Sequence, residues 1–207
     1  MKDTIKAEIY SIFPTPIYLT SLNREFTKSE LSFVDDTKSK TKENFGNIIS
    51  KDSYILNQKK LSNIKEQLDL IIKDYFDKVI SCSEKTKPYI TQSWINYTEA
   101  NQFHHRHNHP QSLVSGVLYI NADKDNDKIK FFKSDYEFFR PEYKEFNLFN
   151  SSSWWFGVKT GDVILFPSSL THDVEIKKGD NTRISLAFNT FIKGNLGIKN
   201  NLTELIL

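Results

Sequence analysis

The sequence predicts a mainly β domain with flanking helices, built as an antiparallel barrel or a double-sheet jelly roll. After Pro88, seven short segments rich in β-branched and aromatic residues alternate with turn residues, and no helical pattern separates them. Before Pro88, apolar residues recur at helical spacing instead. We therefore expect helices from the first part of the chain to cover one outer face of the β-structure. A chain of 207 residues fits a single domain, 1–207.

The N-terminal region, 1–87, is expected to contribute one strand and the supporting helices. Residues 8–20 alternate around Pro14 and Pro16, which predicts a strand broken by a turn at a sheet edge, because proline cannot donate a ladder hydrogen bond. Residues 41–57 are polar, contain Gly46 and have few periodic apolar positions, so they are interpreted as a loop.

Two helices are expected in this region. Thr27 and Glu30 fit a capping box, which predicts a helix that begins there and ends near Lys40. Between Lys60 and about Ser81 the apolar residues form a single stripe at helical spacing. The second helix is therefore expected to be long, amphipathic and packed on the sheet.

The core, 88–193, is expected to hold the strands, and 194–207 forms a C-terminal tail. The Asx-rich segment 121–127 predicts a turn, because Asn and Asp cap local backbone groups. The apolar end of the tail predicts a docking strand or helix, or a contact for another subunit in a possible homodimer. The strands are expected at 89–97, 112–121, 128–132, 153–158, 162–166, 173–177 and 182–193.

Composition argues against several classes of protein. The 28 Lys and Arg nearly balance the 26 Asp and Glu, and no long basic run is present, which weakly disfavours a nucleic-acid partner. The single Cys82 excludes an internal disulfide and favours a reducing, cytoplasmic setting. The N-terminus lacks the pattern of a signal peptide, and no apolar run approaches the 18 residues or so of a membrane span, so no membrane partner is expected.

Four of the five histidines lie within six residues: His104, His105, His107 and His109. Residues two apart project to the same side of a strand, so either His105 with His107 or His107 with His109 can bind one ion. The fifth, His172, follows His109 after 63 residues at the start of an expected strand, where it can supply a third ligand. This layout favours a facial non-haem iron site, although imidazole ligands also suit zinc, nickel and copper.

Arg183 lies 11 residues after His172 on the neighbouring expected strand. On that strand Arg183 and Ser185 share one face, because side chains alternate along a strand. A buried guanidinium with a hydroxyl beside it is a good receptor for a carboxylate, so the sequence predicts an anionic small-molecule co-substrate next to the metal.

Six motifs together resemble a family of 2-oxoglutarate/Fe(II)-dependent oxygenases found in marine phages and in bacteria. They are FPTPIY at 13–18, WINY at 94–97, HNHP at 107–110, SGVLYI at 115–120, GDVILFPSSLTH at 161–172 and RISLAFN at 183–189. The resemblance implies a double-stranded β-helix core of the cupin-like kind. It also implies Fe(II) held by His107, His109 and His172. The resemblance further implies that Arg183, assisted by Ser185, binds the distal carboxylate of 2-oxoglutarate. It also implies that Tyr97, Asn96 or Tyr119 lines the co-substrate pocket.

The chain departs from the wider superfamily at His109, where an Asp or Glu usually stands. Three neutral imidazoles leave the ion with two positive charges instead of one, which shifts its potential and can change the co-substrate. Asp173, next to His172, is an alternative carboxylate that could orient an imidazole. The resemblance implies a dioxygenase that hydroxylates an unidentified substrate and releases succinate and CO2. The competing readings are a three-histidine cupin-like enzyme without 2-oxoglutarate, and a non-catalytic, virion-associated or binding jelly roll.

Overall fold

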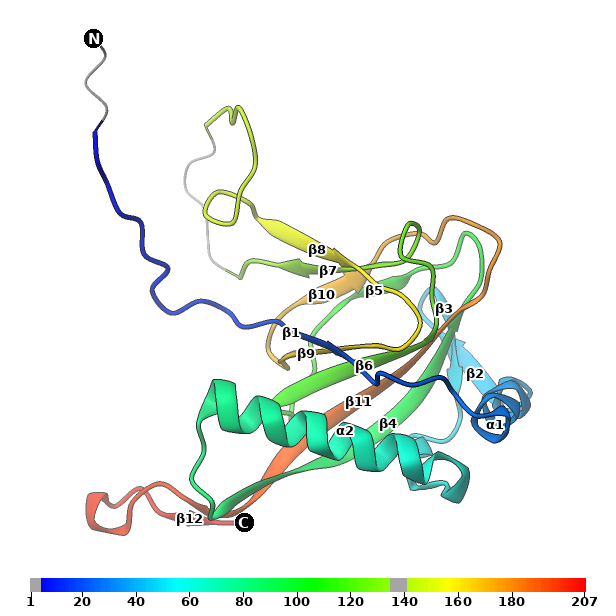
Figure 1. The fold of residues 1–207 in the computed structure, drawn as a ribbon, viewed down its shortest axis with the longest axis horizontal. Coiled ribbons are helices and arrows are strands. Elements are labelled where there is room, and N and C mark those ends of the chain that lie inside the picture. The colour runs from blue at the N-terminus through cyan, green and yellow to red at the C-terminus, as the bar shows by residue number, and fades with distance from the viewer. Residues whose placement is uncertain (1–4, 135–140) are drawn as a thin grey trace.

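The computed structural model describes residues 5–134 and 141–207 (Figure 1). The expected helices are both present, as α1 (Lys28–Lys38) and α2 (Ser62–Tyr75), and a π-helical turn, Phe76–Ile80, extends α2. Short 3-10 turns lie at Ile55–Asn57, Lys59–Leu61 and Lys199–Asn201. The strands are β1 (Tyr18–Ser21), β2 (Thr41–Asn44), β3 (Asn47–Ser50), β4 (Thr86–Thr98), β5 (His104–His107), β6 (Val114–Asn121), β7 (Lys128–Phe132), β8 (Ser153–Gly157), β9 (Asp162–Pro167), β10 (His172–Val174), β11 (Arg183–Leu196) and β12 (Leu205–Ile206).

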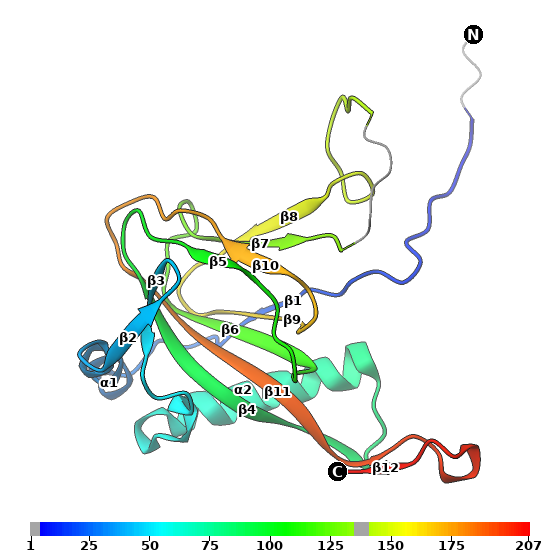
Figure 2. The ribbon, with the colours of Figure 1, turned by 180° about the vertical axis from the view of Figure 1, so that it is seen from behind.

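These strands form two antiparallel sheets that face each other (Figures 1 and 2). The larger sheet has the order β1-β9-β6-β11-β4-β3-β2, with β12 added to the end of β11. The smaller sheet has the order β5-β10-β7-β8. Helix α2 lies across the face of the larger sheet that points away from the smaller one (Figure 2). The predicted mainly β jelly roll with flanking helices is therefore confirmed.

Side-chain alternation divides the interior into two cores. On β9, Val163 and Leu165 belong to the core shared with α2, whereas Ile164 and Phe166 belong to the core between the sheets. On the helix, the buried residues repeat at helical spacing and pack against that same sheet face: Ile64, Leu68, Ile72 and Tyr75. The larger sheet is thus covered on both faces, and the polar residues it carries toward the smaller sheet are enclosed.

The prediction of a polar loop at 41–57 is wrong. Residues 41–50 form a hairpin of β2 and β3, turned at Gly46, and β3 extends the larger sheet by pairing with β4. Its strands are only four residues long, so no alternating pattern is visible in the sequence. The expected strand at 8–20 is present only from Tyr18. Strand β5 was missed, because its four residues, His104–His107, read as a polar loop.

The C-terminal tail docks as a strand, one of the alternatives predicted for it, because β12 pairs with β11 through Asn195 and Ile206. Several apolar side chains of the tail are exposed, including Leu202 and Ile206. The homodimer stays a prediction. No helix in the described part of the chain is long and apolar enough to cross a membrane.

The predicted capping box is confirmed and includes a buried ion pair. Thr27 Oγ1 accepts from the Glu30 N–H, the Glu30 carboxylate accepts from the Thr27 N–H, and both of its oxygens accept from Arg24. Burial disfavours the ionised carboxylate, but the bonds from Arg24 and Thr27 outweigh burial and lower the pKa of Glu30. Because a lowered pKa favours the folded state above the unfolded pKa, this stabilisation is lost as pH falls through the folded pKa.

We therefore expect Glu30→Gln to lower the free energy of unfolding by about 1–3 kcal/mol at pH 7, since it removes one partner of a buried pair. The difference from wild type should shrink at a pH below the lowered pKa of Glu30, where the wild-type carboxyl is itself protonated. Urea denaturation at both pH values measures this, with the exposed Glu25→Gln as the matched control. A difference that is the same at both pH values would refute the role assigned to the ionised carboxylate.

Candidate metal centre

A small cavity of about 40 Å³ lies between the two sheets, and most of the predicted site residues line it. It is bordered by His107, His109 and His172, and also by Asn96, Arg183 and Ser185. The imidazoles come from the smaller sheet and its edge, and the other three side chains come from the larger sheet. The jelly roll therefore brings together residues that are far apart in the sequence.

Strand pairing places the three histidines side by side. His172, the first residue of β10, lies directly opposite His107, the last residue of β5. His109 follows just beyond β5, and its backbone N–H donates to the Ser168 carbonyl at 2.9 Å. The ligand atoms of His107, His109 and His172 all lie within 4.8 Å of one another. A second group with the same spread, His104, His105 and His107, lies entirely on β5.

Backbone carbonyls orient two of these imidazoles. His107 Nδ1 lies 2.7 Å from the His105 carbonyl oxygen, and His172 Nδ1 lies 3.0 Å from that of Leu170. A carbonyl can only accept, so each ring carries its proton on Nδ1 and leaves the Nε2 lone pair for a metal. Asp173, which was predicted as a possible orienting carboxylate, instead lies 3.7 Å from Arg106 Nε.

The spacing of the nitrogens fits one metal ion. His109 Nε2 and His172 Nε2 are 3.4 Å apart although their ring centroids are 5.2 Å apart, so the Nε2 edges face each other. Two imidazole nitrogens at about 2.1 Å from a common ion are separated by about 3.0–3.4 Å. Burial lowers the pKa of His109 to about 4 and that of His172 to about 3. Both rings are therefore neutral near pH 7, which is the form that binds a metal.

Arg183 lines the same cavity. Its side chain is almost completely buried, and among the described residues it donates one hydrogen bond, to Thr98 Oγ1 at 3.1 Å. Asn96 faces the cavity from β4, and its buried Oδ1 has no partner among the described residues. Unused donors and acceptors in a buried site are expected to be satisfied by a polar ligand. The unused N–H donors of Arg183 thus fit a carboxylate, whereas Asn96 Oδ1 can only accept and fits a donor such as a hydroxyl or water.

The remaining two predicted co-substrate residues lie on different sides of the larger sheet. Tyr119 lines the cavity from β6. Tyr97 lies in the core under the helices, where its hydroxyl donates to the Val34 carbonyl at 2.6 Å. Neighbouring residues on a strand face opposite ways, so β4 cannot present both Asn96 and Tyr97 to the cavity.

The cavity is small for a dicarboxylate. Its volume of about 40 Å³ holds one or two water molecules, so lining side chains must move before a larger ligand enters. The Trp94 ring lies 5.8 Å from the His109 ring and borders the cavity. The cavity side of β4 carries every second residue of the strand: Trp94, Asn96 and Thr98. The sequence did not identify Thr98 as a site residue, because a single threonine carries no chemical signal.

Several solved structures have a similar fold. A protein described as an oxidoreductase of the 2OG-Fe(II) oxygenase family from Burkholderia pseudomallei is 14% identical, with a TM-score of 0.56, over 84% of this chain and 83% of that one. HygX from Streptomyces hygroscopicus, solved with nickel, 2-oxoglutarate and hygromycin B, is 13% identical with a TM-score of 0.56, over 85% and 82%. A prolyl-4-hydroxylase from Pseudomonas putida is 14% identical with a TM-score of 0.52, over 84% and 92%.

Among curated proteins no sequence matches the chain. A family model does match, over residues 92–189, and its description reads "Putative 2OG-Fe(II) oxygenase". That segment runs from β4 to β11 and includes the three histidines, Arg183 and Ser185. Residues 92–189, somewhat less than half of the chain, are therefore similar to the family described as 2OG-Fe(II) oxygenases.

Proposed function

We propose that the protein is an Fe(II)- and 2-oxoglutarate-dependent dioxygenase that hydroxylates an unidentified substrate. The observation that carries the proposal is the convergence of His107, His109 and His172 on one cavity that Arg183 also lines. A metal with a bound carboxylate co-substrate needs these two receptors close together.

The residues have separate roles in this proposal. The three imidazoles hold the ion, and the His105 and Leu170 carbonyls fix two of them in the tautomer that binds it. Arg183 and Ser185 receive the distal carboxylate, while Asn96 and Tyr119 line the pocket around the co-substrate. When bound, Fe(II) and 2-oxoglutarate would supply the oxidising power that places a hydroxyl on the substrate, with succinate and CO2 as co-products.

The aromatic wall beside His172 excludes water from the ion. The ring of Phe166 is fully buried, and its centroid lies 4.7 Å from that of His172. Phe131 approaches the same imidazole at 6.1 Å between ring centroids. A dry wall of this kind protects a reactive metal site from side reactions.

Succinate formation tests the proposal. Purified protein with Fe(II), 2-oxoglutarate, dioxygen and ascorbate as the reductant is expected to form succinate even without the substrate, measured by NMR. The His172→Ala variant should form none above the protein-free background. Equal succinate with and without protein would count against the oxygenase.

A three-histidine enzyme that does not use 2-oxoglutarate is the second candidate. The all-imidazole ligand set favours it, because the ion keeps its full double positive charge and can bind an anionic substrate directly. Arg183 would then bind the carboxylate of that substrate. Metal-dependent turnover of a carboxylate without succinate would separate this candidate from the first.

The similar structures point to different substrates. HygX was solved with hygromycin B, and the Pseudomonas protein is a prolyl-4-hydroxylase, so the shared fold selects neither an aminoglycoside nor a prolyl group for this chain. A cytoplasmic location, in a host cell if the chain comes from a phage, stays a prediction from the single Cys82.

A further inference from the structure

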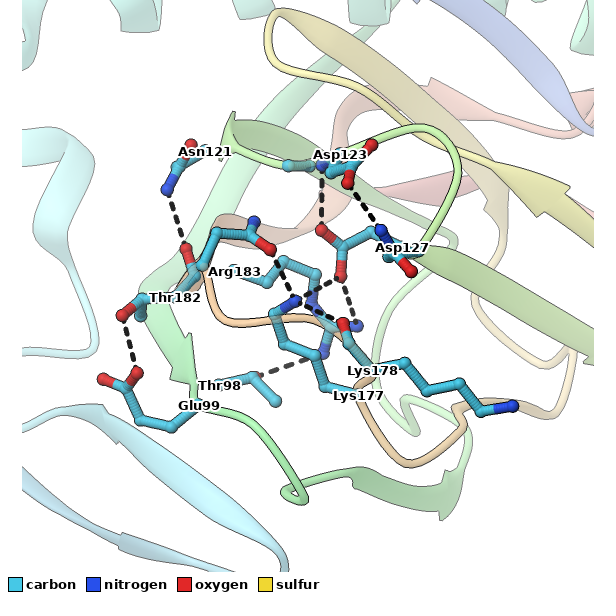
Figure 3. Close-up of polar contacts among 12 residues, drawn as sticks. Thr98, Glu99, Asn121, Asp123, Asp127, Lys177, Lys178, Thr182 and Arg183 are labelled. Carbon is cyan, nitrogen blue, oxygen red and sulfur yellow. Dashed lines mark hydrogen bonds and ion pairs between the residues drawn. The ribbon is translucent and has the colours of Figure 1, made fainter.

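Behind Arg183 lies a buried cluster of three charged side chains that come from three different parts of the chain (Figure 3). Asp127 ends the turn before β7, Lys177 follows β10, and Arg183 begins β11. The side chains of Asp127 and Lys177 are 0% exposed and that of Arg183 is 4% exposed. Lys177 Nζ lies 3.5 Å from Asp127 Oδ1, and Arg183 Nη1 lies 3.9 Å from the same oxygen.

The cluster carries one surplus positive charge, because two cations share a single carboxylate. A buried charge without a counter-ion is unfavourable, and a low-dielectric site strengthens its attraction for an anion. The cavity is where an anion can reach the cluster, since Arg183 lines it. The charge count therefore matches a site that becomes neutral when one carboxylate binds.

Lys177 is fixed in place more firmly than Arg183 is. Lys177 Nζ donates to the Lys178 carbonyl at 3.0 Å and to Asn181 Oδ1 at 2.8 Å, and it is the nearer cation to Asp127. Asp127 is held by its other oxygen, which accepts from the Asp123 N–H at 2.9 Å. Lys177 can thus balance the charge of Asp127 while the guanidinium turns its donors toward a ligand.

We infer that Lys177 and Asp127 are positioning residues that set the charge of the co-substrate site, with Lys177 as the counter-ion that leaves Arg183 free to bind a carboxylate. The inference rests on the proposed function. Without Lys177, Asp127 has Arg183 as its only cationic partner in the cluster, and the surplus charge is lost. Without Asp127, the surplus grows. The two substitutions should therefore change anion affinity in opposite directions, whereas a merely structural role would make both weaken binding.

Calorimetric titration of 2-oxoglutarate into Mn(II)-loaded protein under anaerobic conditions tests this without turnover. Lys177→Met is expected to weaken binding about tenfold or more, and Asp127→Asn is expected to tighten it. The double variant, Lys177→Met with Asp127→Asn, restores the surplus charge and should return to within about threefold of wild type. Lys178→Met is the matched control, because its side chain is exposed and extends away from the cluster (Figure 3).

Weaker binding in both single variants, with a double variant weaker than either, would overturn the inference, as would a folded Lys177→Met protein with wild-type affinity. Thermal unfolding of each variant identifies those that fail to fold. If a single variant does not fold, the affinity of the charge-restored double variant decides whether the inference holds.

Succinate titrated in parallel separates the inference from the proposed function. If wild type binds succinate but not 2-oxoglutarate and the variant pattern persists, the proposed function fails and the inference stands. A wild-type protein that binds neither dicarboxylate overturns the inference.

Discussion

His172→Ala is expected to weaken Fe(II) binding at least about 100-fold, because loss of a partner that merely orients a ligand already costs 10- to 100-fold in metal affinity. His172 is the one imidazole of the site on β10, with its Nε2 directed at that of His109. Replacing it leaves two ligands, His107 and His109, which lie two residues apart in one chain segment. Equilibrium dialysis against Fe(II) under anaerobic conditions measures the affinity.

His105→Ala is the matched control for that experiment. His105 belongs to the alternative group on β5, and its ring lies beside the Phe45 carbonyl, 3.4 Å from Nδ1. We expect this variant to bind Fe(II) as wild type does. The reverse pattern, with iron lost from His105→Ala and kept in His172→Ala, would move the metal to the group of His104, His105 and His107.

Arg183→Met is expected to weaken 2-oxoglutarate binding about 30-fold or more while Fe(II) affinity stays within a few-fold of wild type. The substitution keeps an unbranched apolar stem but removes a buried charge and its hydrogen bonds, a loss of about 2 kcal/mol or more. Asp127 keeps Lys177 as its partner, so the variant is expected to fold. Titration of 2-oxoglutarate into the Mn(II)-loaded protein measures the effect.

Arg106→Met controls for the loss of a positive charge near the site. The Arg106 side chain is 59% exposed and stacks over the Phe132 ring, outside the cavity. Its removal should leave 2-oxoglutarate affinity unchanged. An equal loss in both variants would mean that general electrostatic attraction, and not a carboxylate receptor at Arg183, governs binding.

The sequence was sufficient to predict the long elements and the chemical groups. The stripe of α2 and the alternation of the later strands carry strong periodic signals, and both are confirmed. The hairpin of β2 and β3 was not predicted, because four-residue strands are too short to show an alternating pattern. Its stability comes from the pairing of β3 with β4. The structure was also needed to show which face of β4 lines the cavity. Asn96 lies on that face, whereas Tyr97 lies in the core under the helices.

Histidine spacing could not choose between two ligand pairs, because every second residue of a strand faces the same way. The structure adds the register of β5 against β10, which places His107 opposite His172 and brings both close to His109. The buried partners of Arg183 were beyond sequence reasoning for a similar reason. Asp127 and Lys177 look like ordinary turn residues in a chain where charged residues are common, and only the fold shows them to be enclosed together.

Visible absorption of the protein with Fe(II) and 2-oxoglutarate under anaerobic conditions tests most directly whether the three-histidine site binds both. We expect a charge-transfer band from 2-oxoglutarate bound to the iron in wild type, and no band in His107→Ala. Iron binding without a band would contradict the use of 2-oxoglutarate and favour the three-histidine alternative. A protein that binds no iron would contradict the oxygenase itself.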